Sequence, residues 1–437
     1  MNQYLFSIAA SCCFTAVAQD NDSLAARRWS WHAQTTIVNQ TKPAFDVPYS
    51  GVNSLSAEKE NKTSITTTFY AGMKLWKNAA VFVNPEIAGG SGLSQALGIA
   101  AATNGETFRI GDPAPHLYLA RLYYRQLVAL TKTTQYQAND LNQVAGDVPT
   151  KYVSLTVGKV SIADYFDRNQ YSHDPRTQFL SWGLMSNGAW DYPANTRGYT
   201  PSVILEWVTP KNEWRIASSM VATTANGNTM NTHITKANST TLEYTRHYTC
   251  STKKGAIRLL AFYTTANMGS YRQSMLAPSG APSIETSRQY GHSKYGLAIN
   301  FEQQLFKQGG LFFRGGWNDG HNETWAFTEI DRSASAGVFL NGEKWRRKQD
   351  GIGIAYAFSA LSSLHRDYLT MGGKGFMLGD GQLNYGGEQL AEFYYCADLY
   401  QHQLFLTGTY QMIINPGYNK DRKGPVHVFS VRLHLVI

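Results

Sequence analysis

Apolar and polar side chains alternate strictly in the stretch FSVRLHL at positions 429–435. Successive side chains of an extended strand point to opposite sides, so Phe429, Val431 and Leu433 share one face, opposite Ser430 and Arg432. The same alternation recurs in about sixteen segments of roughly ten residues, separated by turn-forming residues. The sequence therefore predicts an all-β protein whose strands each have one apolar and one polar face.

The composition excludes a helical membrane protein. The chain has 437 residues, of which 16% are charged and 13% aromatic, and its mean hydropathy is -0.33. A transmembrane helix needs about 20 consecutive apolar residues, and beyond the N-terminus no stretch approaches that length. Barrel strands need no such run, because they alternate between lipid and water. We therefore expect a closed antiparallel transmembrane β-barrel of about 16 strands.

Short and long connections alternate along the chain, as they do in bacterial barrels with short periplasmic turns and long extracellular loops. One exception is the connection 132–150, which is long where a short turn is expected. Either it forms an internal periplasmic loop or the strand count is wrong there. We expect both chain ends in the periplasm and long connections at 41–61, 89–115, 163–198, 224–237, 267–292, 359–387 and 415–425.

Three long connections contain patterns that do not resemble strands. Segments 177–187 and 360–371 have the apolar spacing of a helix, and 91–101 is a candidate for a short helix. A helical loop folded into the lumen would narrow the pore. The alternative is that these short helices cap the outer rim, and the sequence leaves both arrangements open.

The first eighteen residues differ from the rest. An uncharged, mostly apolar run at 5–14 precedes Ala16-Val17-Ala18, the small-x-small pattern of a signal-peptidase site. We therefore predict a signal peptide at 1–18 and a single domain at 19–437. Of the four cysteines, only Cys250 and Cys396 would remain, and we expect two free thiols.

The basic residues are scattered, although the formal net charge is +8. The densest cluster, Arg346-Arg347-Lys348, is interpreted as a solvated turn, so no nucleic-acid partner is expected. Tryptophans near the ends of predicted strands are typical of the aromatic girdles at membrane boundaries. They are Trp29, Trp76, Trp207, Trp214 and Trp345.

A series of short motifs follows in order along the chain. They are RNQYSHDPRTQF (168–179), GAWDY (188–192), TRGY (196–199), MGSYR (268–272), WNDG (317–320), FTEIDRS (327–333), HRDY (365–368), GDG (379–381), NY (384–385) and NPGYN (415–419). From about Trp29 to the C-terminus, the sequence resembles the OprB-like carbohydrate-selective porins. The resemblance implies a sixteen-stranded barrel in the outer membrane of a Gram-negative bacterium, and facilitated diffusion of glucose or related sugars.

Strand phase predicts which side chains point into the lumen. On segment 117–127, the residues assigned to the lipid face are Tyr118, Ala120, Leu122 and Tyr124, which directs Arg121, Tyr123 and Arg125 inward. An arginine facing lipid at mid-bilayer would cost about 2 to 4 kcal/mol. Inward charges can contact sugar or merely brace the wall. The inward set is Glu86, Arg121, Tyr123, Arg125, Glu206, Arg258, Glu302, Arg314, Glu329, Glu392 and Arg432.

Loop residues within the family-like motifs are the candidates for a constriction. A neutral sugar needs charged groups as hydrogen-bond partners and aromatic rings for stacking. Trp190 and Asp191 could supply a stacking face and a hydroxyl acceptor, or could fasten the loop to the wall. The loop candidates are Arg176, Trp190, Asp191, Arg197, Arg272 and Arg366.

Three other functions are compatible with parts of this pattern. A barrel enzyme would need an ordered catalytic set, and the sequence shows no such set, no zinc-type histidine pair and no phosphate loop. A soluble β-rich lectin would share the alternation, and a general diffusion porin would share the barrel. We expect no catalytic or metal-binding residues and no cofactor. The expected partners are small carbohydrates, outer-membrane lipid and the barrel assembly machinery, with the protein a monomer or a homotrimer.

Overall fold

The computed structural model describes residues 28–107, 113–276 and 280–437. The predicted signal peptide at 1–18 lies outside these ranges. In the part of the chain that is described, no helix has the length and apolar character needed to cross a membrane.

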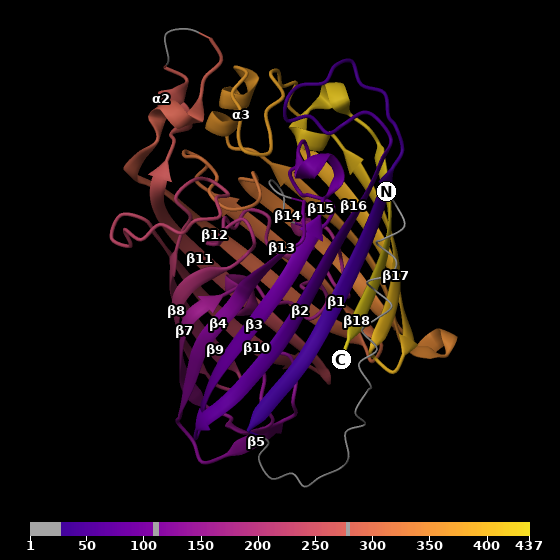
Figure 1. Cartoon of the computed structure of the whole chain (residues 1–437). Coiled ribbons are helices and arrows are strands. Elements are labelled where there is room, and N and C mark those ends of the chain that lie inside the picture. The colour runs from indigo at the N-terminus through magenta and orange to yellow at the C-terminus, as the bar shows by residue number, and fades with distance from the viewer. Residues whose placement is uncertain (1–27, 108–112, 277–279) are drawn as a thin grey trace.

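Within the described ranges, sixteen antiparallel strands close into one barrel, which confirms the predicted fold class (Figure 1). β1 pairs with β18 to complete the cylinder, with Ile37 opposite Leu433, so the barrel sheet has no free edge in the described part of the chain. The barrel strands are β1 (Trp29–Lys42), β2 (Glu60–Trp76), β3 (Ala79–Gly90), β4 (His116–Ala129), β7 (Tyr152–Val160), β8 (Thr200–Val208), β9 (Asn212–Met220), β10 (Asn238–Cys250), β11 (Lys253–Met268), β12 (Gln289–Phe306), β13 (Gly309–Asn318), β14 (Arg332–Gly342), β15 (Arg347–Ala360), β16 (Glu388–Tyr400), β17 (Leu404–Ile414) and β18 (Val426–Val436).

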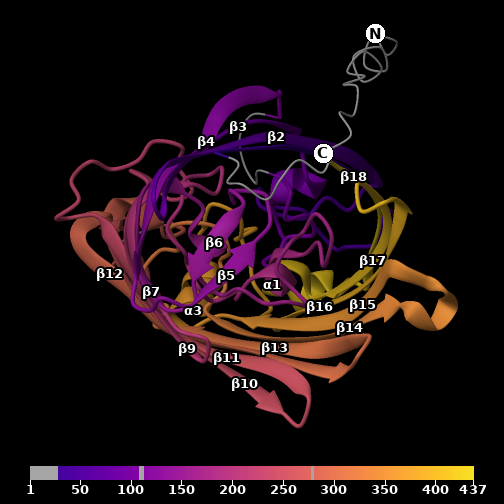
Figure 2. The same cartoon turned by 90° about the horizontal axis from the view of Figure 1, so that it is seen from below.

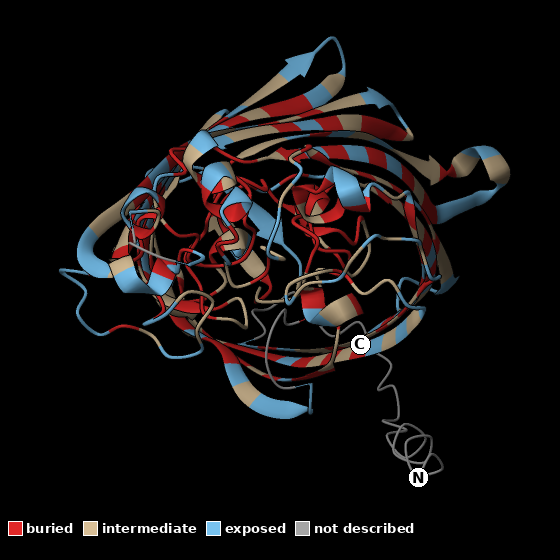
Figure 3. Ribbon diagram, turned by 90° about the horizontal axis from the view of Figure 1, so that it is seen from above, coloured by how far each residue is buried: buried red, intermediate tan, exposed pale blue. Residues whose placement is uncertain are grey.

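Side chains alternate between the two faces of the wall as the sequence pattern predicts. On β18, Phe429 and Val431 are exposed on the outer face, whereas Ser430 and Arg432 are buried. Bands of buried and exposed residues alternate along the strands in Figure 3. The barrel therefore has an apolar outside and a polar inside, the arrangement of a barrel that meets lipid.

One end of the barrel carries short turns and the other carries long loops. We call them the turn end and the loop end. Trp29 and Val436, the two ends of the described barrel, both lie at the turn end, because Trp29 pairs beside the β2–β3 turn and Val436 pairs with Gln34. The loop-end connections are 43–59, 91–115, 161–199, 221–237, 269–288, 319–331, 361–387 and 415–425. The loop 319–331 corrects the sequence analysis, which treated Glu329 as a strand residue.

The long connection between β4 and β7 contains a separate hairpin of β5 (Thr134–Gln137) and β6 (Gly146–Pro149). The barrel strand count is therefore right, and of the two interpretations of 132–150 the internal loop is the correct one. Viewed from the turn end in Figure 2, this hairpin lies within the ring of strands.

A β-bulge interrupts the pairing of β3 with β4. Asn84 pairs with Arg121 and Pro85 pairs with Leu119, which leaves Ala120 without an opposite residue. Proline has no N–H to donate to the strand ladder, and prolines within sheets are confined largely to edges, strand starts and bulges. Pro85 thus explains why the alternation shifts by one residue at Ala120.

This bulge overturns part of the predicted phase of β4. Tyr118 points inward, since its hydroxyl donates to the carboxylate of Glu86, and Ala120 is buried. Both had been assigned to the lipid face. Leu122, which follows the bulge, is exposed as predicted. The predicted inward and outward directions of side chains on β4 are therefore correct after Ala120 and wrong before it.

An α-helix is present in two of the three loops in which a helical pattern was predicted. α3 (Ser363–Thr370) lies within 360–371, and Ser362 caps it by accepting from the backbone N–H of His365. α1 (Trp182–Met185) fills only four residues of 177–187. The prediction for 91–101 is wrong, because η1 (Leu93–Ala96) contains left-handed backbone at Ser94 and Gln95. The remaining short elements are α2 (Tyr271–Ser274), η2 (Ile162–Asp164), η3 (Ile284–Ser287), η4 (Glu343–Trp345), η5 (Pro416–Tyr418) and η6 (Lys420–Arg422).

The predicted tryptophans gather at one end. Trp29, Trp76, Trp207 and Trp214 are exposed at strand ends next to the turns, and Trp345 lies in the β14–β15 turn. The two cysteines are free thiols, as predicted. Cys250 is exposed at the end of β10, and Cys396 is buried.

Candidate functional site

The loop 161–199, which we call the inner loop, fills much of the lumen. Phe166, Trp182 and Tyr192 on this loop are buried within the barrel, and the ring of Trp182 stacks on Phe327 at 4.7 Å between centroids. In Figure 3, buried loop segments occupy the space inside the strands. Of the two arrangements left open for this loop, folding into the lumen is therefore the observed one.

A cavity of about 480 Å³, the central cavity, remains between the inner loop and one side of the wall. The wall contributes residues of β1 to β4, β8 and β9, such as Gln34, Tyr70 and Glu206. Its charged lining consists of six arginines and five carboxylates, which nearly balance. These are Arg121, Arg125, Arg168, Arg176, Arg197 and Arg215, with Glu86, Glu106, Asp164, Asp174 and Glu206.

Two of the arginines join the wall to loops through ion pairs. Arg121, on β4, makes a bidentate contact with Asp164 of the inner loop, at 2.7 and 2.8 Å. Arg176 of the inner loop donates from Nε to Glu106 at 3.0 Å, and its Nη2 lies 3.8 Å from Glu86. Bidentate and charge-assisted bonds fix geometry strongly, so these arginines are held in place around the cavity.

Glu206 connects two further arginines along the wall. Arg215 donates from Nε to Glu206 at 2.9 Å, and Ser154 donates to its second oxygen at 2.6 Å. Arg125 stands farther away, with Nη2 at 3.9 Å from the same carboxylate. The side chain of Arg125 is about one-third exposed, at 33%, and lines the cavity, whereas its buried Nε has no hydrogen-bond partner within the described residues.

Arg168 lines the central cavity without belonging to the predicted set, as do Asp174 and Arg215. It is exposed to the cavity, and among the described residues its guanidinium forms no ion pair or hydrogen bond. Its position at the start of the motif 168–179 was the available signal. Glu106 and Asp164 also line the cavity, but lie in loops where alternation carries no information.

His173 adds no charge to this lining at neutral pH. It belongs to the inner loop and faces the central cavity. Burial, together with the positive charges of Arg314 and Arg168, lowers the pKa of His173 to about 4. The imidazole is therefore neutral around pH 7, and the balance between arginines and carboxylates determines the local field.

The opposite side of the wall holds the inner loop in place. Arg314, on β13, is almost fully buried; its Nε lies 3.1 Å from a carboxylate oxygen of Asp167, and its Nη1 donates to the carbonyl of Leu184 at 2.9 Å. Asp167 in turn accepts from the backbone N–H of Asn187 at 2.6 Å. Buried backbone groups need partners, and this pair satisfies several of them.

Three other predicted wall residues have the same role. Glu302 accepts from the backbone N–H of Gln170 at 2.7 Å, and Arg258 pairs with Glu302 at 3.3 Å. Glu392 accepts from the backbone of Leu180 and Ser181, at 2.6 and 3.0 Å. None of these wall residues lines the central cavity.

Arg432 and Glu329 fasten loops as well. Arg432 donates to the carbonyls of Pro175 and Gln178 in the inner loop. Glu329, in the loop 319–331, accepts from the backbone N–H groups of Met377 and Leu378 at 2.9 and 2.8 Å.

Two further residues that were predicted to contact sugar, Trp190 and Asp191, support the inner loop and do not face the central cavity. Asp191 accepts from the backbone N–H groups of Trp325 and Ala326, at 2.7 and 2.8 Å. Trp190 is buried and its ring lies 5.2 Å from that of Tyr192. Of the two roles considered for Trp190 and Asp191, the geometry corresponds to fastening; Tyr192 is the neighbour that reaches the cavity.

The predicted placement of Arg272 and Arg366 at a constriction is wrong. Arg272 is exposed on α2 at the loop end, and Arg366, on α3, pairs with its neighbour Asp367. Neither lines the central cavity. Both α2 and α3 lie at the top of Figure 1, above the strands. These arginines therefore belong to the outer rim.

The predicted residues thus separate into three groups. The outer rim holds Arg272 and Arg366, and the loop fasteners are Trp190, Asp191, Arg258, Glu302, Arg314, Glu329, Glu392 and Arg432. The cavity is lined by Glu86, Arg121, Tyr123, Arg125, Arg176, Arg197 and Glu206. In the described ranges, no cluster of three or more His, Cys, Asp or Glu side chains could hold a metal ion.

The comparisons with known proteins agree with this geometry. A scan of protein families matches residues 54–436 to the carbohydrate-selective porins of the OprB family. The high-pH structure of Pseudomonas putida OprB has a TM-score of 0.71 at 15% sequence identity, covering 94% of each chain.

Two other solved structures are more distant. The low-pH structure of the same protein has a TM-score of 0.46 at 12% identity, over 93% of each chain. Pseudomonas aeruginosa OccK2 (OpdF) in complex with glucuronate has a TM-score of 0.48 at 9% identity, over 94% of this chain and 98% of that one. At such identities the likeness concerns the fold alone. A search of curated proteins found no match.

Proposed function

We propose that this chain, which belongs to the OprB family of carbohydrate-selective porins, conducts neutral monosaccharides such as glucose by passive diffusion. Family and fold identify a channel rather than an enzyme. The central cavity is the region through which the sugar would pass, and its lining supplies the contacts.

The observation that carries the proposal is the near balance of charge in the central cavity. Six arginines and five carboxylates line it, and ion pairs such as Arg121 with Asp164 reduce the net field. A balanced lining favours a neutral solute over either sign of ion, while the paired groups still offer donors and acceptors to hydroxyl groups. Rings of Tyr123, Tyr165 and Tyr192 add apolar surface for a sugar face.

The expected location is the outer membrane of a Gram-negative bacterium, with the turn end toward the periplasm and the loop end outside. The apolar outer wall supports the membrane location, and the short turns at one end with long loops at the other support this orientation. Residues 1–18 would direct export and be removed. The barrel assembly machinery would insert the chain, which would function as a monomer or a homotrimer.

A liposome-swelling series tests the proposal. Purified protein is reconstituted and the swelling rate measured with glucose, a larger oligosaccharide, amino acids of similar size and small ions, with protein-free liposomes as the control. We expect glucose to enter faster than an amino acid of equal size. Equal rates for all solutes of one size would instead identify a general diffusion porin without sugar preference, the alternative that shares this fold.

A further inference from the structure

The β5–β6 hairpin reaches into the turn end of the lumen and is fastened to one side of it. Asn84 on β3 donates to the side-chain oxygen of Asn142 at 2.9 Å, and Lys74 on β2 donates to the carbonyl of Ala145. Val144, near the hairpin tip, is buried in the same hydrophobic cluster as Phe82 of the wall. The hairpin therefore has a defined position across the exit of the barrel (Figure 2).

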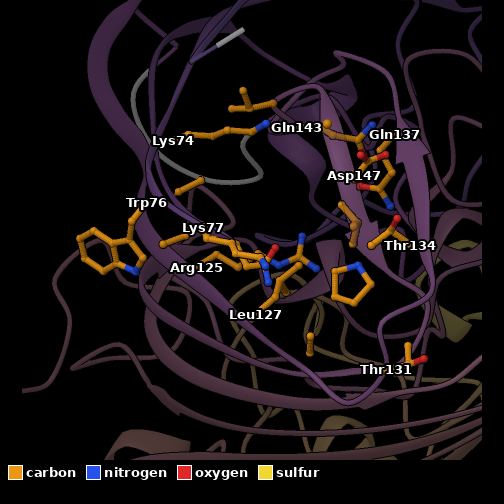
Figure 4. Close-up of a pocket in the computed structure, with 18 of the residues that line it drawn as sticks. Lys74, Trp76, Lys77, Arg125, Leu127, Thr131, Thr134, Gln137, Gln143 and Asp147 are labelled. Atoms are coloured by element: carbon orange, nitrogen blue, oxygen red, sulfur yellow. The ribbon is translucent and has the colours of Figure 1, made fainter. Parts of the chain in front are cut away.

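A second cavity, of about 830 Å³, lies between this hairpin and the wall of β2 to β4. We call it the turn-end cavity. Figure 4 shows Lys74, Lys77 and Arg125 on the wall side and Gln137 and Asp147 on the hairpin side. The ring of Trp76 points away from this group, which agrees with its place on the outer face.

The two cavities share three lining residues. Arg125, Asn142 and Gln143 line both the central cavity and the turn-end cavity. These three residues, the wall arginine and two residues of the hairpin tip, therefore lie between the central cavity and the turn-end cavity. We call this set the junction.

The junction has the chemistry to hold hydroxyl groups. Arg125 offers its partly exposed guanidinium, which in the described part of the chain is joined to Glu206 only at 3.9 Å. The amides of Asn142 and Gln143 each contain both donors and an acceptor. Beside them the rings of Phe82 and Tyr123 stack with centroids 5.0 Å apart, Phe82 lining the turn-end cavity and Tyr123 the central one.

The backbone holds the hairpin amides in this place. Asn142 has a φ of 53°, in the left-handed region that asparagine tolerates better than most residues. The side-chain Nε2 of Gln143 donates to the backbone carbonyl of Ala138 at 2.6 Å, within the hairpin. The tip is thus preorganised before a solute arrives, which reduces the entropy lost on binding.

We propose that the junction is a second sugar-binding site, in which Arg125 and the hairpin amides of Asn142 and Gln143 contact a neutral sugar between the central cavity and the exit. This inference rests on the proposed function. It assigns a binding role to the connection 130–151, which is longer than the other turns at this end, and it adds a selection step after the central cavity.

The test measures how sugar blocks ion current through single channels in a planar bilayer. In the double variant Asn142→Gly with Gln143→Ala, glycine keeps the left-handed backbone while both amides are lost. We expect the half-blocking glucose concentration to rise about threefold to tenfold, the effect of losing one or two net hydrogen bonds.

Two control variants separate contact from position. Gln135→Ala removes an amide from β5 that lines neither cavity, and it should leave the block unchanged. Asn84→Ala removes the bond that holds Asn142 but keeps both hairpin amides, and it should change the block by less than the double variant. Equal effects of Asn84→Ala and the double variant would show that the hairpin only positions other groups, and would overturn the proposal.

The same experiment distinguishes this inference from the proposed function. If the unmodified protein shows no block by glucose, the proposed function fails and the junction site with it. If the unmodified protein is blocked, Arg168→Ala weakens the block and the double variant does not, then the central cavity binds sugar and the junction does not.

Discussion

The two sides of the barrel wall use the same residue types for different purposes. On the cavity wall, formed by β1 to β4, β8 and β9, arginines and carboxylates pair with one another around open space, as Arg121 does with Asp164. On the packed wall, formed by β10 to β18, they bind the backbone of loops, as Glu392 does with Leu180 and Ser181. Inward direction alone therefore does not make a charged residue a contact for the solute.

The physical reason lies in the loops. A loop that enters the lumen carries N–H and C=O groups that must find partners once they leave water. Carboxylates of the packed wall accept from the N–H groups, and Arg314 and Arg432 donate to the carbonyls. On the cavity wall the charged groups pair with one another or with side chains of the inner loop, as Arg121 does with Asp164, and they border the open space of the central cavity.

The largest loss of stability should come from a substitution in the packed wall. Arg314→Ala leaves Asp167 buried without its cationic partner, and breaking a buried pair in this way costs about 3 to 5 kcal/mol. We expect a lower thermal unfolding temperature in detergent and a higher single-channel conductance, because the inner loop is released. Arg272→Ala, at the exposed rim, is the matched control. An unchanged conductance would show that other contacts suffice to hold the loop.

A smaller loss of stability is expected from Glu392→Gln. The amide keeps the size of the side chain but turns an NH2 group toward the backbone N–H groups of the inner loop, so that one donor is left without a partner. A buried unpartnered group costs about 1 to 3 kcal/mol. Thermal unfolding should show this loss. If stability equals that of the unmodified protein, the amide has found another acceptor.

On the inner loop, Arg168→Ala should change solute binding rather than stability. Its guanidinium is exposed to the cavity and, among the described residues, has no bonding partner to leave buried. We expect the half-blocking glucose concentration to rise about threefold to tenfold, with thermal unfolding within about 0.5 kcal/mol of the unmodified protein. A loss of stability as large as that of Arg314→Ala would instead show that Arg168 fastens the loop.

The smallest effect is expected at the rim. Arg272→Ala and Arg366→Ala should leave sugar block, conductance and unfolding unchanged, because both side chains lie outside the central cavity. Single-channel recordings of each variant check this expectation. A clear loss of sugar block in either variant would mean that solutes bind at the loop end before they enter the barrel.

The sequence by itself determined the barrel. Alternation along the strands and the lengths of the connections follow from local rules, since each strand must present one face to lipid and one to water. The inward direction of Arg125, Glu206 and Arg314 followed from the same rule. It failed at Tyr118, because Pro85 acts on the neighbouring strand and shifts the phase of β4.

Only the tertiary structure decided which inward charges face open space. That division depends on where the inner loop packs, and its contacts join residues such as Asp167 and Arg314, which lie 147 positions apart. The alternation of side chains and the lengths of connections describe neighbours in the sequence, so they cannot predict contacts between residues so far apart. The roles of the loop fasteners, the exposed Arg168 and the hairpin across the exit could therefore be seen only once the loops had been placed inside the cylinder.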